Sequence, residues 1–326
     1  MSLDHNQESY DAERIAFLAL SAIKGVGSET LRRIFVAQKS FRGIFELDDA
    51  DTVRALLGRS DMQGSTDGER AWEETRKRAK ESGERRYLEL QASDVSIVFQ
   101  GDKDYPARLL DLKDPPDWLF VQGQLSVLSA PSISVVGSRK ASRDGLWLTE
   151  YVGHWLSEFG AVTVSGLADG VDQVVHSASV NARVPTIAFL GTGIFTEYPK
   201  GSDALRQKIV DHGGAIVTEY LIKDGYSASN FVRRNRLQAA LGKLLIPTEW
   251  AVKSGTAHTV RFAHELSRPI AFVRTPNQPD FGWIPREYVS ANGFFTLPIE
   301  QNRFVDFVLR SLAMDTKAKV EQLTLI

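Results

Sequence analysis

Between Ser132 and about Arg274, short apolar segments alternate with segments that have helical spacing. The apolar segments, which we expect to be strands, cover residues 132–136, 161–165, 186–190, 215–219, 243–247 and 269–273. The segments with helical spacing cover residues 143–159, 171–181, 203–212, 231–241 and 256–266. Nearly continuous apolar strands separated by single helices predict a parallel sheet covered on both faces. The expected fold class is therefore α/β, with a doubly wound, mostly parallel, Rossmann-like sheet that binds its ligand at the carboxyl ends of its strands.

The composition restricts the classes of protein and site. The chain has 326 residues, 43% hydrophobic and 25% charged, which is typical of a globular protein with two or three domains. Because the net charge is −2, any site for a polyanion must be a local basic patch. The absence of cysteine excludes disulfides, thiolate nucleophiles and cysteine zinc sites. The polar N-terminus lacks a signal-peptide core, and no apolar run approaches the roughly 20 residues of a membrane span, so we expect a cytoplasmic protein without a membrane partner.

Three regions are expected along the chain. Residues 1–90 show helical patterns, with a turn at Gly25-Val26-Gly27 between two helices. This turn resembles a helix-hairpin-helix unit that holds a nucleic-acid phosphate, but an ordinary turn in a small all-α, SAM-like domain explains it equally well. Residues 91–275 carry the extended Rossmann-like sheet and its ligand site, and residues 276–326 either complete that domain or form a surface for a partner.

The loops after the predicted strands share a chemistry. Several of them combine glycine with serine, threonine, lysine or arginine; the loops cover residues 137–143, 165–172, 191–202, 230–236 and 248–258. Because the carboxyl ends of parallel strands meet at one edge, a phosphate-binding face explains this pattern better than turn chemistry alone. In the first loop, Gly137, Ser138, Arg139 and Lys140 precede a helix predicted from Arg143, and the N-terminus of that helix favours an anion.

A second cationic wall is predicted at the start of the helix near residue 231. It comprises Phe231, Arg233, Arg234, Asn235 and Arg236. Three guanidiniums within four residues are difficult to bury unpaired, so they suggest a clamp for a nucleic-acid backbone, with an aromatic ring for stacking on a base. The facing wall would hold Arg139 and Lys140, with Lys200 and Lys253 at the rim. The alternative is a solvated helix end with one arginine in an internal salt bridge.

The loop after the second strand is expected to have a structural role. Asp172 is expected to accept backbone N–H bonds from the loop between Gly166 and Gly170, although a general base remains an alternative. Ser165 is no nucleophile, since Thr163 stands where a G-x-S-x-G elbow requires glycine.

Fingerprints of cofactor and metal sites are missing. No loop reads G-x-G-x-x-G or G-x-x-x-x-G-K-[ST], which weakens dinucleotide and nucleoside-triphosphatase functions. His264-Glu265 begins a zinc pattern, but Arg268 stands where the second metal ligand would be. We therefore expect no cofactor, no metal and no catalysis.

Together these segments resemble the DNA-processing protein A family, also called Smf. The resemblance rests on KGVGSETLRRIF, GDKDYPARLLDLKDPPDWLFVQG, GSRKAS, SGLADGVDQVVHSAS, FLGTGIFTEYP, FVRRNRLQAAL and KSGTAHT, and runs from about residue 12 to 275. It implies a dimeric, non-catalytic protein that binds single-stranded DNA, protects it, and helps to load a RecA-type recombinase in natural transformation. The DNA-contacting positions implied are Gly137, Ser138, Arg139, Arg233, Arg234, Asn235, Arg236, Lys253, Ser254, Gly255 and Thr256.

The chain departs from that family's usual pattern at three positions. Asp169 stands where a cation is usual, Val232 where proline is usual, and Thr256 where serine is usual. These differences leave open a diverged paralogue whose partner is not RecA. A second interpretation is a nucleotide-binding sensor or nucleoside-monophosphate-processing enzyme of the related lysine-decarboxylase-like Rossmann group. Thr259 argues against the enzyme, because that group has at this position a glutamate that takes part in glycosidic cleavage.

Overall fold

The structure, a computed structural model, describes residues 2–37, 40–47, 66–290 and 292–314. It contains two compact units, Met1–Ile97 and Val98–Ile326. In these residue ranges, no helix has the length and apolar character needed to span a membrane.

The first unit is helical, as predicted. Its helices are α1 (Ser2–Ala22), α2 (Ser28–Val36), α3 (Phe41–Phe45) and α5 (Thr66–Ala92). The backbones of α1 and α5 approach closely, because a Cβ on Gly83 would lie 2.7 Å from the carbonyl oxygen of Ile15. The fully buried ring of Phe17 packs edge-on against Phe41, with ring centroids 5.1 Å apart. The unit therefore has an apolar core of its own.

The second unit is organised around a seven-stranded sheet with the order β1-β2-β6-β5-β4-β3-β7. Its strands are β1 (Val95–Phe99), β2 (Trp118–Gly123), β3 (Ser132–Gly137), β4 (Val162–Ser165), β5 (Thr186–Phe189), β6 (Ala215–Thr218) and β7 (Leu244–Glu249). The division between the two units falls within β1. Strands β3, β4, β5, β6 and β7 run parallel to one another, whereas β2 runs antiparallel to β6. The predicted mostly parallel, Rossmann-like sheet is confirmed.

The last predicted strand lies outside this sheet, which corrects the expectation of one continuous sheet. β8 (Ala271–Arg274) pairs in parallel with β9 (Gly293–Thr296) in a separate two-stranded sheet. A bridge between Leu245 and Ile270 connects this pair to β7. The apolar pattern at 269–273 identified a buried strand but carried no information on its partner.

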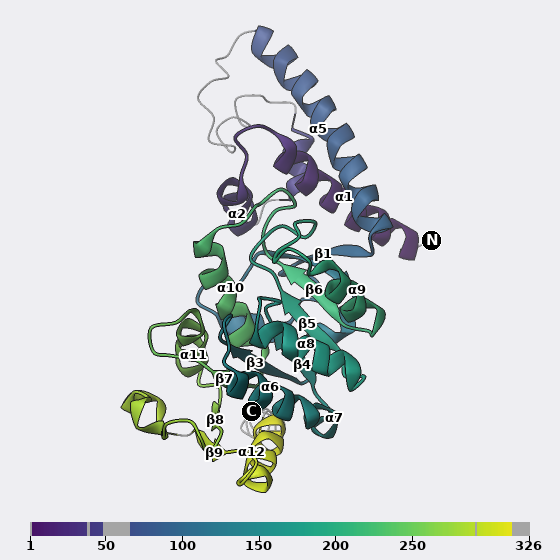
Figure 1. Cartoon of the computed structure of the whole chain (residues 1–326). Helices are drawn as coiled ribbons and strands as arrows, with labels where there is room; N and C mark the ends of the chain where they lie inside the picture. The colour runs from purple at the N-terminus through teal and green to yellow at the C-terminus, as the bar shows by residue number, and fades with distance from the viewer. Residues whose placement is uncertain (1, 38–39, 48–65, 291, 315–326) are drawn as a thin grey trace, which may run out of the picture. The chain divides into compact units, whose positions relative to one another are not determined.

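Helices cover both faces of the large sheet (Figure 1). They are α6 (Arg143–His154), α7 (Leu156–Phe159), α8 (Val171–Asn181), α9 (Asp203–Asp211), α10 (Ala228–Leu241), α11 (Gly255–Glu265) and α12 (Gln301–Ala313), with short 3-10 helices η1 (Ala107–Asp111) and η2 (Leu125–Leu128) before β3. Leu148 of α6 and Phe304 of α12 pack with Ile133 of β3 on one face. Leu237 of α10 packs with Val164 of β4 on the other. The single helix predicted over 143–159 is divided into α6 and α7.

The C-terminal segment packs on this sheet domain. It contains η3 (Phe281–Trp283), η4 (Arg286–Tyr288), β9 and α12. Phe304 and Val308 of α12 are buried in the core of this domain. In addition, Lys243 Nζ donates a hydrogen bond of 2.8 Å to the carbonyl oxygen of Leu312. The segment is therefore part of the core around β3 and β7.

The chain leaves β3 and β7 in opposite directions. These strands are neighbours, yet α6 follows β3 on one face and α11 follows β7 on the other. Loops that diverge in this way leave a crevice at the carboxyl ends of the strands, where doubly wound sheets bind their ligands.

Candidate nucleic-acid interface

A cavity of about 500 Å³ lies in this crevice. Four segments line it: the end of β3 with the loop after it, the loop before α8 with the start of that helix, the loop before α10 with α10 as far as Gln238, and the start of α11. The sequence-predicted residues among its lining are Gly137, Ser138, Arg139, Lys140, Asp172, Phe231, Arg234, Asn235, Ser254, Gly255 and Thr256. Segments about a hundred residues apart in the sequence therefore meet at one cavity.

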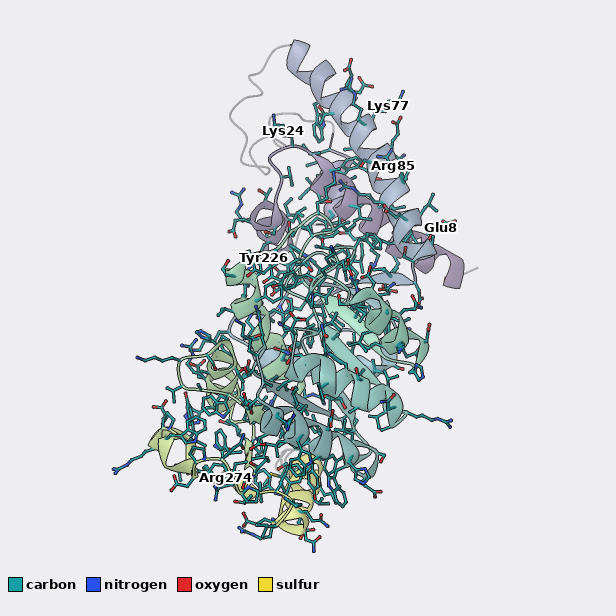
Figure 2. All side chains as sticks on the ribbon, viewed as in Figure 1. Glu8, Lys24, Lys77, Arg85, Tyr226 and Arg274 are labelled. Carbon is teal, nitrogen blue, oxygen red and sulfur yellow. The ribbon has the colours of Figure 1, made fainter. Side chains whose placement is uncertain are left out.

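The cavity has a charged, exposed mouth and a buried floor. The mouth is formed by Arg139, Lys140 and Tyr226, which are exposed, and the floor includes Arg234 and Gln238, which are each 2% exposed. Figure 2 shows Tyr226 just before the N-terminal end of α10. A ligand in this cavity would meet exposed cations first and buried polar groups at the end.

The N-terminus of α6, where the sequence suggested an anion, is occupied by a side chain of the protein. The carboxylate of Glu249 accepts hydrogen bonds from the backbone N–H of Ser142 at 3.1 Å and from its hydroxyl at 2.6 Å. A Cβ on Gly145 would overlap that carboxylate, so a larger residue there would displace the Glu249 side chain. The carbonyl of Glu249 also accepts the N–H of Ser138 at 2.8 Å. Glu249 thus holds Ser142, whose hydroxyl caps α6 by accepting the N–H of Gly145 at 3.0 Å, and it fixes the loop after β3. The phosphate expected at this helix end stays a prediction, with a carboxylate of the protein beside it.

The N-terminus of α11 lines the cavity instead. Ser254 caps this helix, while the N–H groups of Gly255 and Thr256 belong to its first turn and have no intrahelical acceptor. Asn235 Nδ2 donates to the carbonyl of Gly255 at 3.0 Å, and Thr256 Oγ1 donates to the carbonyl of Gly137 at 2.9 Å. These bonds join α10, α11 and β3, and the helix dipole adds partial positive charge to the cavity.

Arg234 places a buried positive charge at the floor. Its Nη1 donates to the carbonyl oxygen of Phe189 at 2.6 Å, and a Cβ on Gly166 would overlap the guanidinium. Burial lowers the pKa of Arg234 to about 10, partly opposed by the charge of Asp172. Burial likewise raises the pKa of Asp172, while Arg234 acts in the opposite direction. The floor therefore keeps a cation at neutral pH, close enough to a carboxyl group for the two to influence each other.

Three aromatic rings lie beside the mouth. The rings of Phe231, Tyr198 and Tyr226 have centroids 4.8 to 5.3 Å apart, and the guanidinium of Arg139 lies 5.1 Å from the centre of Phe231. Sequence reasoning identified Phe231 but missed both tyrosines. They stand in the loops after β5 and β6, so a search for aromatic residues at the carboxyl ends of the strands could have found them.

Arg236 lies outside the cavity lining. Its Nη1 and Nη2 donate to the two carboxylate oxygens of Glu219 at 2.6 and 2.7 Å, and its Nε donates to Asp114 at 3.2 Å. The half-exposed Arg233 lies against the same two acids, 3.6 Å from Asp114 and 3.8 Å from Glu219. Burial would lower the pKa of Arg236, but the hydrogen bonds and charge of Glu219 outweigh it, so the pKa is raised. The internal salt bridge left open as an alternative is present at Arg236, while Arg234 and Asn235 line the cavity.

The remaining predicted cations lie farther out. Lys200 and Lys253 are exposed and do not contribute to the lining of the cavity. The exposed Asp169 accepts a hydrogen bond of 3.2 Å from Gln173 and is also outside the lining. In the same loop, Ser165 donates its hydroxyl to the carbonyl of Val135 at 2.7 Å.

The loop before α8 is tightly packed against the loop after β3. Gly170 has φ of +78°, and a Cβ there would overlap the carbonyl oxygen of Ser138. Burial is the largest influence on the pKa of Asp172 and raises it, while Arg234, Ser165 and the backbone of Ala168 act in the opposite direction. Across the residues that the structure describes, no group of three or more histidine, aspartate or glutamate side chains could hold a metal ion.

The sequence is similar to a known family and to several of its members. The sequence model of the family described as "DNA recombination-mediator protein A" matches residues 96–281. Protein Smf of Synechocystis sp. is 30% identical over 275 residues, covering 83% of this chain and 66% of that protein. Protein Smf of Escherichia coli is 37% identical over 185 residues, covering 56% and 48%. The chain thus spans about half to two thirds of the length of these relatives.

A solved structure supports the fold. The X-ray structure of DNA processing protein A (DprA) from Streptococcus pneumoniae matches with a TM-score of 0.60 at 24% identity, covering 89% of this chain and 94% of that one. The family model covers more than half of the chain and includes all four segments that line the cavity. The chain therefore belongs to the DNA recombination-mediator protein A family.

Proposed function

We propose that this protein binds single-stranded DNA in the cavity between the loop after β3 and the helices α10 and α11. One observation carries the proposal: a single cavity combines exposed cations, a helix N-terminus and a cluster of aromatic rings. Cations and backbone N–H groups suit the phosphates of a strand, and aromatic rings suit its bases.

The arrangement favours a single strand over a duplex and over one compact phosphate. Tyr226 is 56% exposed, so its ring is accessible to an unpaired base, whereas the bases of a duplex are already stacked on one another. Arg139 and Lys140 are adjacent exposed cations at the mouth, which suits phosphates that follow one another along a backbone. The Glu249 carboxylate places a negative charge beside Ser142 at the α6 N-terminus, so the strand would approach along α10 and α11.

The relatives support a role in DNA processing. They are named Protein Smf and DNA processing protein DprA, and the family description names recombination mediation. We include in the proposal that this protein, like the family that its sequence resembles, is a cytoplasmic, non-catalytic dimer that protects single-stranded DNA and helps to load a RecA-type recombinase.

Isothermal titration calorimetry tests the DNA-binding proposal. The titrants are a single-stranded oligonucleotide of about 16 nucleotides, the same sequence as a duplex, AMP and a cyclic nucleotide. We expect tightest binding of the single strand, weakened by Arg139→Ala and unchanged by Arg310→Ala, which removes an exposed arginine of α12 far from the lining. Binding of AMP without binding of the oligonucleotide would instead support a nucleotide sensor.

A further inference from the structure

A buried carboxamide at the floor of the cavity lacks a hydrogen-bond partner. Gln238 lines the cavity and is 2% exposed, and its buried Nε2 makes no hydrogen bond to the described part of the chain. Its backbone is fixed, because its carbonyl accepts the hydroxyl of Ser134 at 2.6 Å. Buried polar groups in native proteins nearly always have partners, so this donor points to a ligand atom that is absent from the free chain.

The position of Gln238 on α10 places it beside the cationic floor. It follows Arg234 by four residues, and side chains spaced in this way lie on the same face of a helix. Arg234 Nε is likewise buried without a partner in the described ranges. Two donors on one helix face therefore point to the same space, which favours a ligand with hydrogen-bond acceptors on its edge.

A nucleobase fits this floor better than a phosphate does. Asp172 also lines the cavity, and its carboxyl group in the charged form repels a phosphate but accepts the amino hydrogens of a base. Val136 and Ala168 contribute apolar surface for a flat ring, and the volume of about 500 Å³ lies in the range of roughly 300 to 1,000 Å³ for small-ligand sites. The charges that suit phosphates are at the mouth instead.

We propose that one nucleobase of the bound strand enters the cavity and that Gln238 selects adenine there. This inference rests on the proposed binding of single-stranded DNA. A carboxamide carries a donor beside an acceptor, which matches the N7 acceptor and the N6 amino group of adenine. Gln238 Nε2 donates to N7, and its carboxamide oxygen accepts from N6. Gln238 is thus a specificity-determining residue that gives the protein a base preference.

The test compares two oligonucleotides of equal length, one containing adenine and the other 7-deazaadenine, which stacks similarly but lacks the N7 acceptor. Fluorescence anisotropy measures the dissociation constants. We expect the wild type to bind the adenine strand about tenfold more tightly. Gln238→Leu should bind both strands as weakly as the wild type binds the 7-deaza strand. The matched control, Gln207→Leu on the exposed side of α9, should behave as the wild type.

The outcomes separate this inference from the proposed function. If the wild type binds both strands equally, or if Gln238→Leu weakens both by the same factor, Gln238 does not read N7, and DNA binding itself stands. If no oligonucleotide binds the wild type, the proposed function fails. Thermal unfolding confirms that Gln238→Leu is folded, since removing an unpaired buried donor should not lower the melting temperature. Gln238→Met serves as a second variant and should lose the discrimination in the same way.

Discussion

The ion pair between Arg236 and Glu219 gives the sharpest prediction about stability. Arg236 and Glu219 side chains are 4% and 8% exposed, and two hydrogen bonds of 2.6 and 2.7 Å join them. Arg236→Ala would leave the Glu219 carboxylate buried, with Arg233 still 3.8 Å away as a weaker partner. Breaking a buried pair from one side costs about 3–5 kcal/mol of unfolding free energy, and the remaining Arg233 contact favours the lower end of that range.

Urea denaturation followed by circular dichroism measures this change. The double variant Arg236→Met/Glu219→Leu should recover most of the lost stability, because replacing both partners by apolar residues leaves no uncompensated charge. The folded fraction of Arg236→Ala should bind oligonucleotide with the same salt dependence as the wild type, since Arg236 is outside the cavity lining. The contrary result has two parts. Arg236→Ala would be as stable as the wild type, and the slope of the logarithm of its binding constant against the logarithm of the salt concentration would be smaller in magnitude by about 0.7, the value for one lost phosphate contact on a single strand.

Three further predictions concern the floor, the mouth and the core. Gly166→Ala should displace the Arg234 guanidinium, destabilise the fold by about 1–3 kcal/mol in urea denaturation and weaken oligonucleotide binding in anisotropy assays. The control Gly101→Ala, where a Cβ meets open space, should change neither stability nor binding. Tyr226→Ala should weaken binding by about 1–3 kcal/mol while Tyr226→Phe binds normally, and equal loss in both would exclude stacking. Burial lowers the pKa of His176 to about 3, so the folded state stays unprotonated while the unfolded state takes up a proton below its ordinary value near 6.5. Stability should therefore fall as the pH drops from about 6.5 toward 3, by up to about 1.4 kcal/mol per unit, and His176→Gln should reduce that slope in urea titrations.

The sequence was sufficient to predict the elements of the sheet domain. Strands β3 to β7 are short apolar segments with both faces buried, so their pattern is unambiguous. The convergence of the loops followed from topology, because parallel strands connected by right-handed crossovers place their carboxyl ends at one edge. The pairing of β8 with β9 could not be predicted in this way, since a buried strand has the same composition whichever neighbour it has.

The details of the site depended on pairs of residues far apart in the chain. Glu249 binds the N-terminus of α6 from a position 107 residues after Ser142, and no local pattern announces it. Arg236 differs from Arg234 only in its direction from the helix, which brings it to Glu219 and Asp114 rather than to the cavity. A run of arginines indicated positive charge, but only the helix orientation determined which guanidinium faces the ligand.

Photochemical cross-linking tests most directly whether the cavity is the DNA site. A single-stranded oligonucleotide carrying 5-iododeoxyuridine is bound, irradiated and digested with protease, and mass spectrometry identifies the attached peptides. We expect attachment to peptides that contain Tyr198, Tyr226 or Phe231. Tyr226→Ala should reduce this attachment, and an excess of unlabelled strand should compete with it. Attachment confined to the first unit or to α12, with none at these three rings, would contradict it.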